Sequence, residues 1–304
     1  MRNSYLAALY ELAQEDKNVY ALISDNGAIV YDKFRRDFPN QYLNFGISEA
    51  NMLGAAAGMA SCGKIPFAYT IGAFLAYRAF EFIRNDICLQ KQNVKIVGIG
   101  AGEVYSALGP THHATEDLGG LRTLPNLTII CPASPLEAKK ATFAAYNHKG
   151  PLYLRLGTNR EPEIYESDYD FELGKGVVLR EGNDITLIGT GSILKDILSA
   201  ADKLKEKGVN ARVINIHTLK PIDGAIIEKA IEETGRIITV EDHNITGGLG
   251  SAAAEVIAEY GRQVKFKRVG LTDFSKGYGS YEEVKNANGV GISNIVEAVD
   301  KMLE

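Results

Sequence analysis

Apolar and polar positions follow two patterns along the chain: short continuous apolar runs, and longer stretches with an apolar residue every three or four positions. Runs of the first kind suit parallel strands that are covered on both faces. Stretches of the second kind predict helices, as in residues 194–204, after which Gly208 predicts a helix end. The pattern therefore predicts an α/β protein. The expected strands are residues 19–23, 94–99, 127–131, 152–156, 185–188, 211–216, 237–240 and 264–269.

The alternation lapses between Arg160 and Leu173. This stretch is acidic, contains Pro162 and has no period, which is typical of a linker across the surface. A chain of 304 residues is also long enough for two domains. We therefore expect two doubly wound domains: a mostly parallel-sheet domain over residues 1–165 and a smaller α/β domain over residues 175–304.

Composition narrows the class of protein. The chain is 45% hydrophobic and 23% charged, and its net charge of -5 argues against a nucleic-acid partner. No apolar run approaches the roughly 18 residues that span a bilayer, and residues 2–13 fit an amphipathic helix rather than a secretion signal. The scattered cysteines (Cys62, Cys88 and Cys131) are typical of reduced thiols. A cytoplasmic protein with no membrane partner is expected.

Candidate chemistry begins at Glu49. This acid precedes a segment of small residues, 54–60, which predicts a helix that opens with a carboxylate. An acid in apolar surroundings is costly to bury without a partner, so it either meets a polar ligand or remains exposed in a favourable first turn. Both interpretations remain open from this segment alone.

Three aromatic residues follow at three-residue steps, Phe74, Tyr77 and Phe80. On one helix they lie along a single face. Such a stripe packs into a core in most proteins, but it also forms a stacking surface for a flat ring.

A loop punctuated by Gly109 and Pro110 carries His112 and His113. Histidine titrates near neutrality and both donates and accepts hydrogen bonds, so the pair indicates a polar site. Alternatively, Thr115 or the acids after it cap the next helix. A zinc site lacks a third well-spaced ligand, and no metal site is expected on this chain.

Two charged residues stand at predicted strand ends. Asp25 follows the first strand, and the carboxyl ends of parallel strands are where ligands bind in α/β proteins. Arg155 suits an anionic substrate group or a surface ion pair. The glycine-rich segment 98–102 is a weak dinucleotide fingerprint, because its third glycine has the wrong spacing and no helical pattern follows, and the segment 189–192 is explained by a tight turn.

Four segments recur in the order in which they occur in transketolases: residues 46–49 (Gly-Ile-Ser-Glu), 74–80 (Phe-Leu-Ala-Tyr-Arg-Ala-Phe), 109–112 (Gly-Pro-Thr-His) and 124–126 (Leu-Pro-Asn). The chain resembles the C-terminal half of transketolase, its pyrimidine-binding domain followed by a small C-terminal domain, over nearly its full length. The Gly-Asp-Gly motif of the other half does not occur. The resemblance implies a split transketolase whose partner chain carries that motif and holds Mg²⁺ and the diphosphate of thiamine diphosphate, in an α2β2 heterotetramer.

The resemblance also implies roles at the cofactor. Glu49 would hydrogen-bond the ring nitrogen of the aminopyrimidine and drive its imino tautomer. Phe74, Tyr77 and Phe80 would wall the pyrimidine ring, and Asp25 matches an acid near the cofactor. These assignments come from the family and not from spacing.

On the substrate side, His112 matches a substrate-contacting histidine that assists proton transfer, His113 is its neighbour, and Arg155 matches a substrate-phosphate arginine. Three positions depart from the family: Leu108 stands for an Asp that reads a substrate hydroxyl, Ile29 for a phosphate-binding Ser, and Gly100 for a further His. Loss of such groups changes which substrates are discriminated, so the usual sugar phosphates are in doubt.

Three other functions remain open. The beta subunit of 2-oxo-acid dehydrogenases has the same two-domain layout and a similar Ile-Ser-Glu segment, although the Gly-Pro-Thr-His loop favours a transketolase. Deoxyxylulose-phosphate synthase is related, but it is normally one long chain. A docking or regulatory subunit without catalysis would keep the fold, and the retained Glu49 argues only modestly against it.

Overall fold

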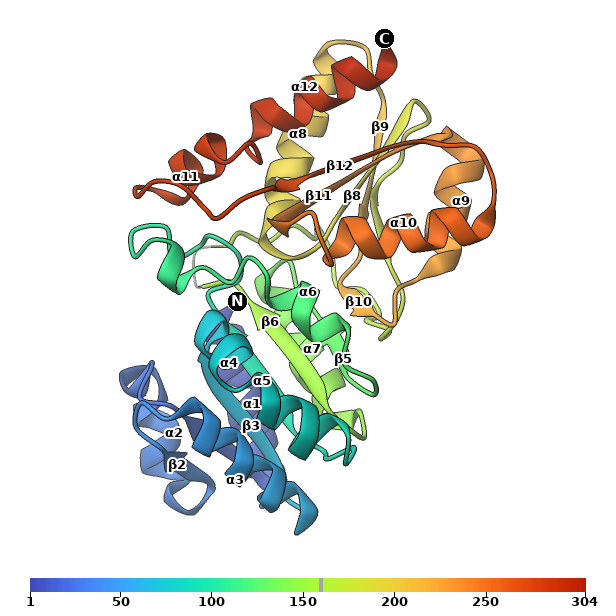
Figure 1. Ribbon diagram of the computed structural model, residues 1–304. Coiled ribbons are helices and arrows are strands. Elements are labelled where there is room, and N and C mark those ends of the chain that lie inside the picture. The colour runs from blue at the N-terminus through green and yellow to red at the C-terminus, as the bar shows by residue number, and fades with distance from the viewer. Residues whose placement is uncertain (159–160) are drawn as a thin grey trace.

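The computed structural model describes residues 1–158 and 161–304, and it contains two α/β units that lie end to end (Figure 1). The N-terminal unit is built on a seven-stranded sheet and the C-terminal unit on a five-stranded sheet. The predicted α/β class is confirmed. Arg160, the predicted start of the linker, lies outside the described residues.

The first sheet is parallel except at one edge. Its strand order is β10-β5-β6-β4-β3-β1-β2, and β10 runs antiparallel to β5. The strands β1 and β6 have the bounds that the apolar runs predict. The seven strands are β1 (Val19–Ile23), β2 (Tyr42–Asn44), β3 (Ile65–Ile71), β4 (Lys95–Ile99), β5 (Thr128–Ile130), β6 (Leu152–Leu156) and β10 (Thr218–Lys220).

The second sheet has the order β12-β11-β8-β9-β7, with β7 antiparallel at its edge. Neighbouring residues of β8 point to opposite faces: Leu187 joins an apolar cluster with α8 and α12, whereas Ile188 joins one with α9 and α10. Helices therefore cover both faces. The strands are β7 (Val177–Arg180), β8 (Ile185–Gly189), β9 (Ala211–Asn215), β11 (Arg236–Asn244) and β12 (Lys265–Leu271).

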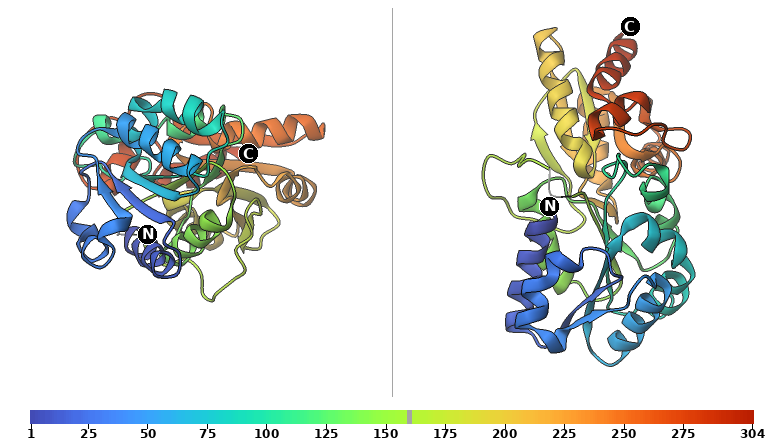
Figure 2. Two further views of the ribbon diagram at one scale, coloured as in Figure 1. Left: turned by 90° about the horizontal axis from the view of Figure 1, so that it is seen from below. Right: turned by 90° about the vertical axis from the view of Figure 1, so that its left-hand side faces the viewer.

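Helices surround both sheets, and the side view in Figure 2 shows α8 and α12 rising together at the C-terminal end. Within the described residues, no helix has both the length and the apolar character needed to cross a bilayer. The helices are α1 (Arg2–Glu15), α2 (Asp32–Asp37), α3 (Glu49–Ser61), α4 (Gly72–Arg78), α5 (Phe80–Phe82), α6 (Asp117–Arg122), α7 (Pro135–Asn147), α8 (Leu194–Glu206), α9 (Gly224–Thr234), α10 (Leu249–Tyr260), α11 (Tyr281–Ala287) and α12 (Ile292–Leu303).

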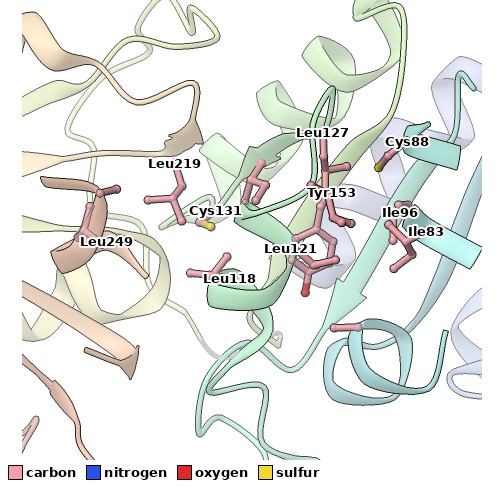
Figure 3. Close-up of a cluster of buried hydrophobic side chains, with 14 of the residues drawn as sticks. Ile83, Cys88, Ile96, Leu118, Leu121, Leu127, Cys131, Tyr153, Leu219 and Leu249 are labelled. Atoms are coloured by element: carbon pink, nitrogen blue, oxygen red, sulfur yellow. The ribbon is translucent and has the colours of Figure 1, made fainter. Parts of the chain in front are cut away.

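One apolar cluster crosses the border between the two units. Leu118 and Leu121 of α6 belong to the same cluster as Leu219 of β10 and Leu249 of α10 (Figure 3). The strand β10 belongs to the C-terminal part of the sequence, but it pairs with β5 in the first sheet. The two units therefore share a core as well as a border.

Candidate functional site

Glu49 begins α3 and is buried, with 4% of its surface exposed. The alternative of an exposed first-turn acid is therefore wrong. Its carboxylate accepts a hydrogen bond from Arg78 Nη1 at 3.2 Å. Among the described residues no other side chain donates to it, which leaves Oε2 for a further donor. A buried carboxylate with one partner is an expensive arrangement that a ligand can complete.

The loop before Glu49 is tied to the end of β1. Ser24 Oγ donates to the Gly46 carbonyl at 2.7 Å and accepts from the Ser48 amide at 3.0 Å. Asn44 Oδ1 accepts from the amides of Asp25, at 3.1 Å, and Gly46, at 2.9 Å. Asp25 is exposed and has a positive φ of 56°, which non-glycine residues rarely adopt outside functional or tight turns. The structure thus places Asp25 just after the carboxyl end of β1, beside the loop that precedes Glu49.

Arg78 links Glu49 to the aromatic residues. Its guanidinium carbon lies 3.9 Å from the centroid of the Phe74 ring, a cation–π contact within α4. Phe74 in turn faces His112, with 5.0 Å between the ring centroids. Three distant segments of the sequence therefore meet in one chain of contacts, Glu49–Arg78–Phe74–His112.

Tyr77 and Phe80 take different positions. The helix α4 ends at Arg78 and is followed by α5, so the predicted single helical face does not reach Phe80. Phe80 packs against the cluster shared with α6, and Phe74 packs against the other cluster of the first unit. Tyr77 is 46% exposed, and its hydroxyl donates to Glu116 Oε2 at 2.8 Å.

The two histidines differ in their surroundings. His112 Nδ1 lies 3.0 Å from Thr111 Oγ1, so Nε2 is the ring nitrogen left for a substrate. His113 is 1% exposed and has no partner for either ring nitrogen among the described residues. Burial lowers the pKa of His113, which favours its neutral form. The described residues contain no group of three His, Cys, Asp or Glu side chains that could hold a metal ion.

Arg155 has partners within the chain. It is 3% exposed, and its Nε donates to Asp117 Oδ2 at 2.9 Å while Nη2 donates to the Ala114 carbonyl at 2.7 Å and the Asp242 carbonyl at 3.2 Å. These donors are committed to internal acceptors. The contact of Arg155 with a substrate phosphate stays a prediction, and it would have to use Nη1, because Nε and Nη2 already donate to acceptors within the chain.

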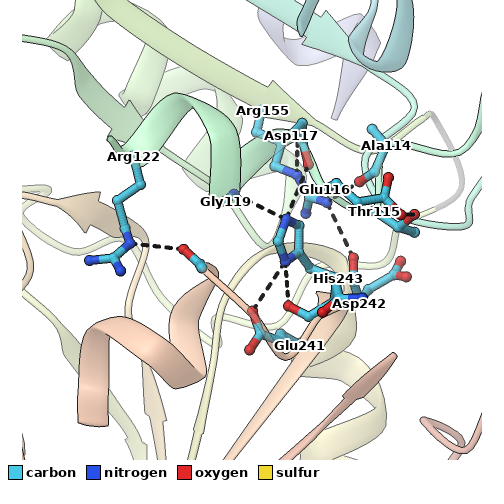
Figure 4. Close-up of polar contacts among 12 residues, drawn as sticks. Ala114, Thr115, Glu116, Asp117, Gly119, Arg122, Arg155, Glu241, Asp242 and His243 are labelled. Carbon is cyan, nitrogen blue, oxygen red and sulfur yellow. Dashed lines mark hydrogen bonds and ion pairs between the residues drawn. The ribbon is translucent and has the colours of Figure 1, made fainter. Parts of the chain in front are cut away.

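The polar segment at the end of β11, residues 241–244, meets the histidine loop and was missed from the sequence (Figure 4). His243 Nε2 accepts from the Gly119 amide at 3.2 Å, and the Asn244 amide donates to the Thr115 carbonyl at 2.7 Å. A signal was present: Asp242 and its polar neighbours directly follow the apolar run 237–240, at the carboxyl end of a parallel strand.

The contact chain lies apart from the cavity at the domain border. This cavity of about 270 Å³ lies between Val104, Tyr281 and Lys285, and Glu49, Phe74 and His112 do not line it. The contact chain instead offers a buried carboxylate, an aromatic face and an imidazole beside solvent. These groups fit a planar nitrogen heterocycle, which can stack on Phe74 and donate to Glu49.

Comparison with known families assigns both units. A transketolase pyrimidine-binding domain matches residues 1–161, and a transketolase C-terminal domain matches residues 174–295.

Several known relatives match along most of their own length. A putative transketolase C-terminal section of Methanocaldococcus jannaschii is 37% identical over 98% of this chain and 95% of the relative. One of the subunits of an apulose-4-phosphate transketolase, from Actinobacillus succinogenes, is 39% identical over 87% of this chain and 85% of the relative. A 6-deoxy-6-sulfo-D-fructose transketolase subunit of a Clostridium species is 34% identical over 100% and 94%.

A solved structure described as a split gene transketolase, inactive beta4 tetramer, superposes with a TM-score of 0.89 at 39% identity, covering 99% of this chain and 97% of that one. The chain belongs to the transketolase family, in which it corresponds to the pyrimidine-binding and C-terminal domains that occur as a separate chain in the split members.

Proposed function

We propose that this chain is one subunit of a thiamine-diphosphate-dependent transketolase, which moves a two-carbon ketol unit from a ketose to an aldose. A partner chain with a Gly-Asp-Gly motif would hold the diphosphate and Mg²⁺, in an α2β2 heterotetramer. The relatives named as transketolase subunits support this activity class. The unpaired state of all three cysteines fits the reducing cytoplasm.

The observation that carries the proposal is the burial of Glu49 with a single donor, next to the Arg78–Phe74 stack. When bound, thiamine diphosphate would supply the carbanion chemistry that carries the two-carbon unit. Glu49 Oε2 would exchange a proton with the ring nitrogen of the aminopyrimidine. Phe74 would hold the ring flat, with Tyr77 and Phe80 as further proposed wall residues.

On the substrate side, His112 Nε2 would hold and transfer protons at the sugar oxygens, because Nδ1 is engaged with Thr111. His113 would act beside it as a neutral neighbour, and Asp25 would lie near the cofactor. The loop tie through Asn44 fixes the backbone of Asp25 relative to the loop that precedes Glu49.

The need for a partner is supported by exposed apolar residues near Glu49. Ile47, two residues before the acid, is 78% exposed, and Ile29, in the turn after Asp25, is 84% exposed. Large apolar side chains grouped at a polar site are typical of a surface that another chain covers. These side chains favour completion of the site by the partner.

Substrate choice is proposed to differ from that of ordinary transketolases. Ile29 and Leu108 are both exposed and cannot hydrogen-bond a phosphate or hydroxyl through their side chains, and Nε and Nη2 of Arg155 already donate within the chain. This chain therefore offers less phosphate recognition than the family pattern implies. The donor ketose and acceptor aldose would be selected in part by the partner.

The test is reconstitution of the chain with a candidate partner that carries Gly-Asp-Gly. The pair should transfer a two-carbon unit from ketose donors when thiamine diphosphate and Mg²⁺ are added. Pyruvate should be a poor substrate by comparison. Decarboxylation of pyruvate without ketol transfer would instead assign the chain to the 2-oxo-acid dehydrogenase class.

A further inference from the structure

The loop that carries His112 has paired ends. The Gly102 amide donates to the Ala114 carbonyl at 3.1 Å, and the Ala114 amide donates back to the Gly102 carbonyl at 3.0 Å. We call residues 102–115 the His112 loop. Its tip holds the Gly-Pro-Thr-His turn, and its two ends form one base.

The C-terminal domain is hydrogen-bonded to both ends of this base. At the start of the loop, the Glu103 amide donates to Asp242 Oδ1 at 3.0 Å and Oδ2 at 3.2 Å. At its end, the Thr115 carbonyl accepts from the Asn244 amide at 2.7 Å. Arg155 Nη2 joins the Ala114 carbonyl to the Asp242 carbonyl, as Figure 4 shows. All of these contacts converge on residues 242–244 of β11.

The Asp242 carboxylate packs closely against the backbone of Gly102 at the loop base. Gly102 has a φ of +57°, and a Cβ there would lie 2.1 Å from the Asp242 carboxyl carbon. The same carboxylate accepts a hydrogen bond from the Tyr281 hydroxyl of α11. Asp242 is therefore buried. It is hydrogen-bonded to Tyr281 of its own domain and contacts the loop base.

From these contacts we propose that Asp242 of the C-terminal domain is a positioning residue for the reaction: it fixes the base of the His112 loop and so sets the place of the His112 imidazole against Phe74. This inference rests on the proposed function for its catalytic consequence. The hydrogen bonds between residues 242–244 and the loop base are present whatever reaction the chain serves.

The carboxylate offers an acceptor oxygen to both the Glu103 amide and the Tyr281 hydroxyl. Asn at position 242 could keep one oxygen toward the Glu103 amide and donate its NH₂ to the Tyr281 hydroxyl oxygen, which loses only the second contact to that amide. Ala would remove all of these contacts. A small shift at the base displaces the loop tip, and misplacement by about 1 Å costs on the order of 100-fold in rate when a group must meet its substrate.

The experiment compares Asp242→Asn and Asp242→Ala with Glu137→Gln in the full-length chain. Glu137 is a matched control, because it is also buried and also accepts from a backbone amide, that of Ala133, and from a tyrosine hydroxyl, that of Tyr165, while its hydrogen-bond partners lie outside the His112 loop. Tyr281→Phe serves as a milder variant that removes one donor to Asp242 and leaves its carboxylate in place.

Three readouts follow: amide exchange of residues 102–115, the imidazole NMR signals of His112, and kcat and KM of the complex with its partner. Asp242→Ala should speed exchange in the loop at least about 10-fold, shift the His112 signals and lower kcat about 10- to 100-fold, with the KM for thiamine diphosphate within about twofold. Asp242→Asn should act in the same direction but less. Glu137→Gln should leave all three unchanged.

Unchanged loop exchange in both Asp242 variants would overturn the inference, as would faster exchange with kcat within twofold of wild type. If the wild-type complex transfers no ketol unit, the proposed function fails. Exchange and imidazole signals then still decide whether Asp242 fixes the loop.

Discussion

At the scale of single residues, Arg78 explains how a buried acid is tolerated. Its guanidinium donates to Glu49 and stacks on Phe74, so it neutralises the carboxylate and covers the aromatic face at once. The guanidinium is planar and carries N–H donors, and an aminopyrimidine ring shares both features. Arg78 therefore occupies the space where we expect the cofactor ring to meet this chain.

Replacement of Arg78 by Ala should lower the free energy of unfolding of the isolated chain by about 1 kcal/mol, because it leaves Glu49 buried without its donor. The value is modest because Arg78 is half exposed. Chemical denaturation checks it, with Arg84→Ala as the control. Arg84 is exposed and bonds only locally, to Asn85. Equal stability of the two variants would show that the Glu49 pair contributes nothing.

A single residue could be recognised from the sequence where the residues next to it form an unusual pattern. Glu49 stood out because an acid before a run of small residues is unusual. The internal partners of Arg155 were not predicted, because they include Asp117 and Asp242, which lie 38 and 87 positions away. Sequence spacing contains no information on such partners, and a strand-end arginine looks the same whether it faces solvent or the core.

At the scale of elements, apolar runs predicted the strands best. The missed central strand β3 begins Ile65-Pro66, and proline argues against a central strand because it has no amide hydrogen. In the structure, Pro66 pairs with Tyr20 of β1, and the ladder to β4 starts only at Phe67. The proline is thus tolerated where one side of the strand is unpaired.

The His112 loop and the C-terminal domain also meet through a pair of buried acids. Burial and the neighbouring Asp242 raise the pKa of Glu103 from 4.5 to about 8, while Ser275, Lys285 and Asn288 partly offset the shift. The folded state holds this proton more tightly than the unfolded chain. The contribution of Glu103 to the free energy of unfolding is therefore present below pH 4.5 and is lost as pH rises to about 8.

Glu103→Gln should remove this pH dependence, because the amide keeps the acceptor for Asn288 and carries no titrating proton. Between about pH 6 and 8 the unfolding free energy of wild type should fall relative to Glu103→Gln, by at most about 1.4 kcal/mol per pH unit. Thermal melts across this range measure the difference. Glu282→Gln, at an exposed position of α11, should instead follow wild type; parallel curves for all three proteins would contradict the assignment.

At the scale of the whole molecule, the two units are joined by shared structure. The strand β10 completes the first sheet from the C-terminal part of the chain, and an apolar cluster continues from α6 to α10 (Figure 3). A sequence divided at an acidic linker does not predict such an exchange, because β10 is three residues long and is separated from β5 along the chain by β6, β7, β8 and β9.

On the proposed function, the isolated chain should bind thiamine diphosphate and Mg²⁺ weakly, because the partner would hold the diphosphate and this chain would contact only the ring. Addition of the partner should tighten binding by at least about 100-fold, as a second set of contacts becomes available. Isothermal titration of the chain alone and of the complex measures the ratio. Tight Mg²⁺-dependent binding by the chain alone would remove the need for a partner.

The most direct measurement of the central claim is the turnover of the reconstituted complex with Glu49→Gln. This variant keeps an oxygen for Arg78 but cannot accept and return a proton, so kcat should fall by about 100- to 10,000-fold while the complex still assembles. Glu81→Gln, at an exposed position of α5, is the matched control and should retain wild-type turnover. Turnover of Glu49→Gln within a few-fold of wild type would contradict the account.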